Sequence, residues 1–181
     1  EDQDAAGDGI QDVDIVLTTR EIGRLLKQCN IDFANLPDEE FDPAMGVSTG
    51  AGAIFGATGG VMEAALRTAA DTIFGAPLEN IEYHEVRGTQ DYKEATYNLN
   101  GLEVKVAVVS GLENANTLLE KVRSGEADCQ FIEIMCCPGG CVNGGGQPTQ
   151  PADVRNFTDL KSLRAKALYE EDKNLPFRKS H

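Results

Sequence analysis

The chain has 181 residues, of which 41% are hydrophobic and 25% charged, a balance typical of a globular protein. Its formal net charge of −14 argues against nucleic acid and anionic membranes as partners, because both are negatively charged themselves. No apolar run approaches the ~20 residues of a membrane span. No charged leader followed by an apolar stretch is present, so a signal peptide is not expected.

The N-terminal part predicts a flexible segment followed by a strand and a helix. Residues 1–9 are acidic or small and predict a flexible lead-in, and residues 10–181 are predicted to form a single α/β domain. Branched residues over 12–19 predict a strand. Thr19 resembles a helix N-cap, and the helix is predicted to end near Cys29. Its apolar positions share one face: Ile22, Leu25, Leu26 and Cys29.

The middle of the chain predicts a close-packed turn, a helix and a hairpin. The Gly/Ala-rich residues 48–58 permit close backbone packing, and a helix is expected over 59–73. Residues 81–87 are predicted as a strand. Strands over 94–99 and 102–109 are predicted to form a hairpin, because Asn-Gly separates them.

The C-terminal part predicts a helix over 112–124, a strand over 128–135 and a final helix over 158–171. The expected core face of the final helix comprises Leu160, Leu163, Ala167 and Leu168. The order of elements predicts the α/β class, with a three-layer sandwich in which helices flank a small mixed, mainly parallel sheet.

The stretch 135–148 carries the strongest chemical signal, because it holds three of the five cysteines and follows a predicted strand. Cys137 and Cys141 are separated by three residues, Pro-Gly-Gly, and two thiolates on such a turn can face one soft metal centre. Adjacent Cys136 and Cys137 do not suit a disulfide framework. An iron–sulfur cluster is favoured over zinc, because no second Cys or His pair lies nearby in sequence. A cysteine-bearing loop without metal remains the alternative.

Other chemistries have weaker support. The glycines at 144–146 lack the Lys-Ser/Thr of a phosphate-binding loop, which argues against nucleotide binding. Cys29, Cys129 and His84 are expected to be structural, and no nucleophile–base–orienter set is apparent.

The run Phe-Ile-Glu-Ile-Met-Cys-Cys-Pro-Gly-Gly-Cys at 131–141, with Gly-Gly-Gly-Gln-Pro at 144–148, resembles the third signature of iron-only hydrogenases. Residues 14–21, 48–67 and 85–88 also resemble this family, as do the terminal residues 178–181. The resemblance implies reversible reduction of protons to dihydrogen at the H-cluster. That cofactor is a 4Fe–4S cubane linked through a cysteine to a diiron unit.

The resemblance also implies roles for individual residues. Cys137 matches a cubane ligand, and Cys141 matches the cysteine that bridges the cubane to the diiron unit. Met135 and Phe55 match residues that line the diiron pocket. Cys136 stands where the family often has Ala, which leaves three interpretations: a bystander, a redox-sensitive thiol or a competing ligand.

Two further cubane cysteines come from earlier family signatures that this sequence does not contain. The resemblance therefore implies the second lobe of a catalytic domain, whose partner is the remainder of that domain. Through the parent protein, the electron partner would be ferredoxin or an NAD(P)-linked carrier. The isolated chain is expected to be an inactive domain without bound cluster, and cytoplasmic, with a periplasmic location in some members. The alternative function is a non-catalytic iron–sulfur or cluster-assembly relative.

Overall fold

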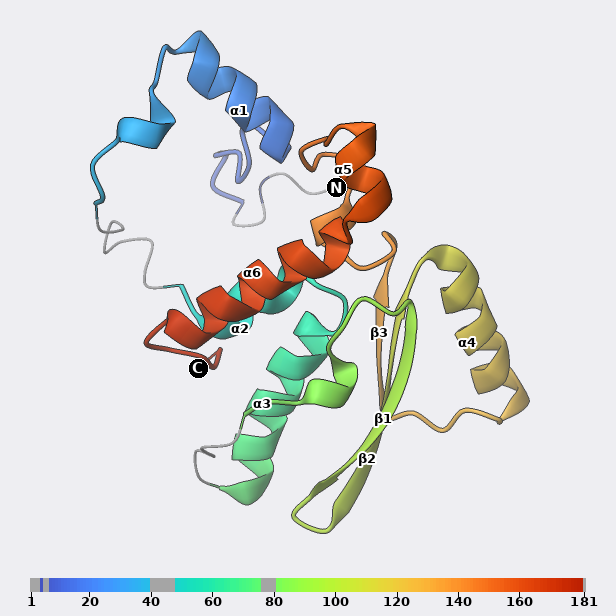
Figure 1. Ribbon diagram of the computed structural model, residues 1–181. Coiled ribbons are helices and arrows are strands. Elements are labelled where there is room, and N and C mark those ends of the chain that lie inside the picture. Colours follow the sequence, from blue (N-terminus) through green and yellow to red (C-terminus); the bar gives the residue numbers. More distant parts are fainter. Residues whose placement is uncertain (1–3, 5–6, 40–47, 76–80, 181) are drawn as a thin grey trace. The chain divides into compact units, whose positions relative to one another are not determined.

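The computed structural model describes residues 4, 7–39, 48–75 and 81–180 (Figure 1). The chain divides into two compact units, where the sequence predicted one domain over 10–181. The N-terminal unit comprises residues 1–40 and 145–150, and the sheet unit comprises 41–144 and 151–181. Most of the predicted lead-in over 1–9 lies outside the described residues. None of the described helices is long and apolar enough to cross a membrane.

The N-terminal unit contains helix α1 (Thr19–Gln28) and the short 3₁₀ helix η1 (Phe33–Asn35). The N-cap is Thr18 and not Thr19, because Thr18 and Glu21 form a reciprocal capping box. The strand predicted over 12–19 was wrong, since residues 12–18 form no strand and Val16 is 85% exposed. Branched residues favour an extended backbone, but a strand also requires a neighbouring strand that accepts its hydrogen bonds.

The sheet unit is built on three strands, β1 (Tyr92–Leu99), β2 (Leu102–Ser110) and β3 (Phe131–Met135), in that spatial order. β1 and β2 form the predicted antiparallel hairpin, and Asn100 and Gly101 both have positive φ, as the tight turn requires. β2 and β3 are parallel. The predicted small mixed sheet is confirmed, with one pairing of each kind.

Helices cover both faces of this sheet, which confirms the three-layer arrangement (Figure 1). Helix α3 (Gly60–Phe74) packs through Met62 and Leu66 on one face, against Val106 and Val108. Helix α4 (Leu112–Ser124) packs through Leu118 on the other face. Successive β2 side chains therefore enter opposite layers, as the pleat of a strand dictates.

The strand predicted over 81–87 was wrong, because these residues include the 3₁₀ helix η4 (His84–Val86). Tyr83 and Val86 join the cluster under α3, whereas Glu82 and Arg87 enter an ion network. Burial and ion pairing of these side chains therefore decide the backbone here, rather than their strand propensity.

The remaining elements are α2 (Gly50–Ala53), η3 (Ile54–Gly56), η5 (Cys141–Asn143), α5 (Ala152–Phe157) and α6 (Leu160–Asn174). The predicted core face of α6 was correct only in part: Leu160 and Leu168 are partly buried, but Leu163 is 55% exposed and Ala167 is also exposed. Ala165 and Asp172 are buried instead, and α6 packs closely against the glycines of α2 and η3. A Cβ on Gly56 would lie 2.8 Å from Leu168 Cδ1.

Candidate functional site

Strand β3 delivers the cysteine loop to the end of the sheet. Glu133 and Met135 pair with Val108 and Ser110 of β2, and Val108 belongs to the cluster under α3. Glu133 and Met135 therefore point to the α3 side, and Cys136 follows directly after the last residue of the strand. The strand ends where the Gly111 amide donates to the Met135 carbonyl at 2.8 Å.

A tight turn separates the two cysteines of the C-x3-C motif. The Gly140 amide donates to the Cys137 carbonyl at 2.9 Å, and Gly139 has φ of 83°. Proline followed by a glycine of positive φ is the pattern of a type II turn. Cys137 and Cys141 therefore lie at the two ends of one turn. Cys141 is exposed, and Cys137 is partly buried.

The protein itself satisfies the polar backbone groups of this loop. The Gly139 amide donates to Ser110 Oγ at 3.0 Å, and the Thr58 amide donates to the Gly139 carbonyl at 3.2 Å. Asn143 Nδ2 donates to the Pro138 carbonyl at 3.1 Å, and Arg164 Nη1 donates to the Val142 carbonyl at 2.9 Å. These bonds fix the course of residues 138–142 without any contribution from a ligand.

Two motifs distant in the sequence meet in this loop. A Cβ on Gly140 would lie 2.6 Å from the Thr58 nitrogen and 2.8 Å from the Gly56 carbonyl oxygen. The cysteine loop therefore packs, backbone against backbone, on the turn that follows Phe55. Phe55 is 46% exposed and lines a shallow, open depression of about 400 Å³ along α3, which none of the cysteines lines.

A buried carboxylate and a buried ammonium group lie beneath the loop. Glu133 accepts from the Gly59 and Met62 amides, both at 2.7 Å. Lys93 Nζ donates to the carbonyls of Thr58 at 3.0 Å and Gly88 at 2.9 Å. Burial lowers the pKa of Lys93 to about 8, against the opposing attraction of Glu133 and Asp91. Sequence reasoning missed both residues, although a glutamate between two isoleucines of a strand was a usable signal.

A second buried network joins α3, α6 and the C-terminal segment. Arg67 forms a two-pronged contact with Asp172 at 2.8 and 2.9 Å and also contacts Glu63 at 2.8 Å. Arg87 contacts Glu63 at 2.6 Å, and Arg178 contacts Asp172 at 2.7 Å. The guanidinium groups hold the pKa of Asp172 below its usual value despite burial. This network orders the scaffold and contains no cysteine.

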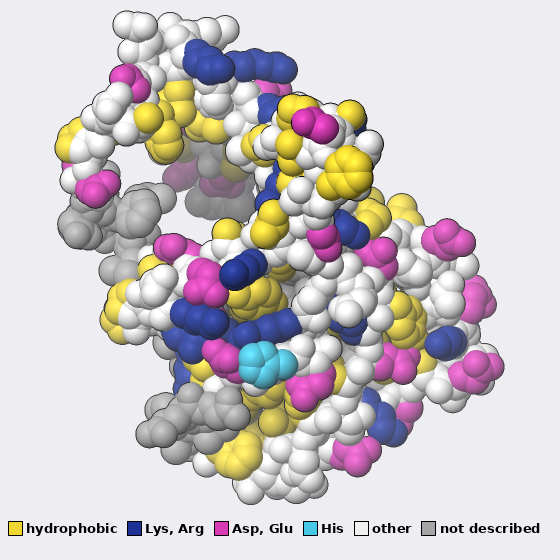
Figure 2. All heavy atoms as spheres, in the orientation of Figure 1, with side chains coloured by type: hydrophobic (Ala, Val, Ile, Leu, Met, Phe, Trp, Pro, Cys, Tyr) yellow, Lys and Arg dark blue, Asp and Glu magenta, His cyan; other side chains and the backbone are white. Residues whose placement is uncertain are grey.

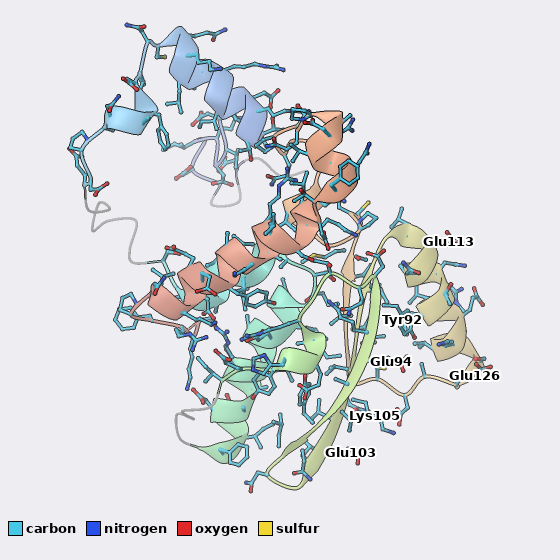
Figure 3. All side chains as sticks on the ribbon, viewed as in Figure 1. Tyr92, Glu94, Glu103, Lys105, Glu113 and Glu126 are labelled. Atoms are coloured by element: carbon cyan, nitrogen blue, oxygen red, sulfur yellow. The ribbon has the colours of Figure 1, made fainter. Side chains whose placement is uncertain are left out.

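The surface and the other cysteines offer little competing chemistry. Figure 2 shows acidic side chains spread over the visible face of the molecule. A cavity of about 290 Å³ on the α4 side of the sheet is lined by Glu94, Lys105, Glu126 and Cys129, the first three of which are labelled in Figure 3. Burial raises the pKa of the Cys129 thiol, which makes it a poor nucleophile and metal ligand.

The donor set fits part of an iron–sulfur cluster. Cys137 and Cys141 supply soft thiolates at a fixed turn, and thiolates are the ligands that such a cluster requires. Across the described ranges, no three His, Cys, Asp or Glu residues gather closely enough to hold a metal ion. Cys136 is exposed, and its role stays a prediction.

Comparison with known proteins gives the family. Residues 1–145 match the model of the iron-only hydrogenase large subunit, C-terminal domain. The chain belongs to the iron-only hydrogenase family. It is 51% identical to iron hydrogenase 1 of Clostridium pasteurianum over 96% of this chain and 30% of that protein. Thus the resemblance of the cysteine loop and of residues 48–67 is part of a relationship that covers almost the whole chain.

Other members of the hydrogenase family and its relatives agree with this assignment. The fold matches FeFe-hydrogenase HydA1 from Chlamydomonas reinhardtii with a TM-score of 0.71 and 37% identity, over 98% of this chain and 50% of that one. The chain is also 34% identical over 78% of its length to cytosolic iron-sulfur assembly component 3 of Pongo abelii, of which it covers 30%. The chain therefore spans half or less of the length of these proteins.

Proposed function

We propose that this chain forms one half of the active-site region of an iron-only hydrogenase, which reversibly reduces protons to dihydrogen. In this proposal Cys137 and Cys141 are ligands of a 4Fe–4S cubane, and Cys141 also bridges to the diiron unit. The carrying observation is that both thiols lie at the ends of a turn that Ser110 and Thr58 hold in place.

When bound, the cluster would relay electrons from the donor and provide the metal centre at which protons are reduced. The residues of this chain bind, orient and shield it. The turn at 137–140 fixes the spacing of the two cysteines. Met135 and Phe55 are proposed to exclude water from the diiron pocket.

The remainder of the hydrogenase catalytic domain is the proposed partner, because a cubane takes four protein ligands and this loop offers two. That partner would carry the other cubane cysteines. The physiological electron donor, a ferredoxin or an NAD(P)-linked carrier, would then act through the complete protein. The chain alone is proposed to be catalytically inactive.

The test combines this chain with the remaining catalytic lobe and the maturation machinery, then measures hydrogen evolution and bound iron. The combined protein is expected to evolve hydrogen, and Cys137→Ser and Cys141→Ser to abolish this. Cys136→Ala is the matched control and should retain activity, because the iron-only hydrogenases that this segment resembles often have Ala at this position. Activity that survives Cys141→Ser, or an assembled complex without activity, would refute the proposal.

A non-catalytic role in iron–sulfur assembly is the second candidate, favoured by the similarity to the assembly component of Pongo abelii. The higher identity to the Clostridium hydrogenase favours catalysis. Infrared spectra separate the two, because only a hydrogenase H-cluster carries carbon monoxide and cyanide. A loaded complex with an iron–sulfur absorption but no such bands would support assembly.

A further inference from the structure

We infer that Glu133 is a positioning residue: it sets the first turn of α3 against β3, and so holds the Phe55 turn against the cysteine loop. This inference rests on the proposed function for its catalytic meaning. Its structural content rests on contacts within the sheet unit alone.

Glu133 caps the N-terminus of α3 from a distant strand, whereas a helix is commonly capped by a side chain of its own N-terminal segment. The N-cap of α3 is Gly59, which has no side chain with which to cap the helix. The Gly59 and Met62 amides occupy the N-cap and N3 positions, and each donates to a different oxygen of Glu133 at 2.7 Å. A local capping box satisfies the same two amides. The carboxylate also lies at the positive end of the helix dipole.

The link continues from α3 to the cysteine loop through Thr58. Thr58 directly precedes Gly59, and its amide donates to the Gly139 carbonyl at 3.2 Å. On the other side, Lys93 Nζ holds the Thr58 carbonyl at 3.0 Å. Thr58 is fully buried, so its backbone cannot exchange these partners for water. A displacement of the first turn of α3 must therefore move residues 56–58, on which Gly140 packs.

Glu133 also lies close in the sequence to the candidate site residues Met135 and Cys137. Met135 follows it by two residues on the same face of β3, and Cys137 begins the turn two residues later. One carboxylate therefore joins the two segments that carry the candidate pocket residues. Lys93 is the charged group that interacts with Glu133 here, and it balances the buried negative charge. Another buried carboxylate, Asp71, lies near the opposite end of α3 and pairs with Lys179.

The test uses Glu133→Gln in the full 181-residue chain, with Asp71→Asn as the matched control. The amide side chain keeps one acceptor oxygen but carries no charge, so one helix amide loses its acceptor and the other loses a charged acceptor. Exchange at Gly59 or Met62 should accelerate about tenfold or more. The decisive readouts lie further away: amide exchange at Thr58, and alkylation of Cys137 by iodoacetamide, should both accelerate severalfold. Asp71→Asn should lower the urea midpoint but leave both rates unchanged.

Unchanged Thr58 exchange and Cys137 alkylation in Glu133→Gln, at a lowered urea midpoint, would overturn the inference and leave Glu133 a purely stabilising residue. If Glu133→Gln does not fold, Lys93→Met provides a second test, because it removes the contact between Lys93 and the Thr58 carbonyl. The measurements are again the Thr58 exchange rate and the Cys137 alkylation rate. Protection equal to the parent chain in Lys93→Met would then overturn it. These readouts require no cluster, so their outcome is independent of whether hydrogen evolution is observed.

Discussion

Substituting Gly140 by alanine should disrupt the contact between the cysteine loop and the turn after Phe55. The added Cβ would lie 2.6 Å from the Thr58 nitrogen and 2.8 Å from the Gly56 oxygen. Both are backbone atoms, so they cannot rotate away as the end of a side chain can. Gly140 also has φ of 95° and ψ of −169°, a conformation that is almost restricted to glycine.

The magnitude follows from these two effects. The backbone conformation costs about 1–3 kcal/mol for a residue with a Cβ. Relief of the overlap requires residues 56–58 to move and breaks the bond from the Thr58 amide to Gly139, which adds about 1 kcal/mol. We expect Gly140→Ala to lower the free energy of unfolding by about 2–4 kcal/mol, a large part of the stability of an ordinary domain.

Urea unfolding of three glycine variants of the same loop provides the assay. Gly145→Ala is the neutral control, because no atom lies within 4 Å of its Cβ, and it should change the free energy by less than about 0.5 kcal/mol. Gly139→Ala should have an intermediate effect of about 1–2 kcal/mol, because it has positive φ but meets only the flexible Lys161 side chain. If Gly140→Ala is no more destabilising than Gly145→Ala, the proposed packing of the two segments is incorrect.

Three further predictions concern the scaffold. Asp172→Asn should cost about 3–5 kcal/mol in urea unfolding, because it leaves buried Arg67 with a weakened counter-charge. Burial lowers the pKa of Lys93 from 10.5 to about 8, so between these values the unfolded chain binds a proton that the folded chain does not. The Lys93 contribution to stability therefore rises with pH over this window, and the parent chain should gain about 2–3 kcal/mol relative to Lys93→Met between pH 8 and 10.5, measured by urea unfolding. Thr18→Ala removes the capping box of α1 and should reduce the stability of that helix by about 1 kcal/mol, visible as lower helicity by circular dichroism.

Elements with strong local signals could be predicted from the sequence. The hairpin around Asn100 follows from a dipeptide that itself selects the turn, and α3 and α4 follow from long apolar patterns bounded by glycine. The segments 12–19 and 81–87 also contain branched residues, but their backbone conformation depends on partners elsewhere in the chain. The local pattern of residues does not reveal that residues 12–19 lack a neighbouring strand. It also does not reveal that Glu82 and Arg87 take part in an ion network.

The position of the two candidate cysteines on a turn after a strand could be predicted, but the contacts that support this turn could not. Residue spacing and family resemblance indicated Cys137 and Cys141, and the structure places them on a turn at the end of a strand, as expected. Glu133 and Lys93 were missed because their partners are distant in the sequence. The two α3 amides that Glu133 accepts from lie 71 and 74 residues before it, and the Thr58 carbonyl that Lys93 contacts lies 35 residues before Lys93. A charged residue at a core-facing strand position marks such a contact without identifying its partner.

The same support has a consequence for how a cluster would bind. Ser110, Thr58, Asn143 and Arg164 already satisfy the polar groups of the loop, so ligation need not order this backbone. The entropy of fixing the turn is lost when the sheet unit folds, and not when the cluster arrives. Cluster affinity should then depend mainly on the number of thiolates available. A second lobe that brings the missing cysteines would therefore complete a ligand set of which this half is already in place.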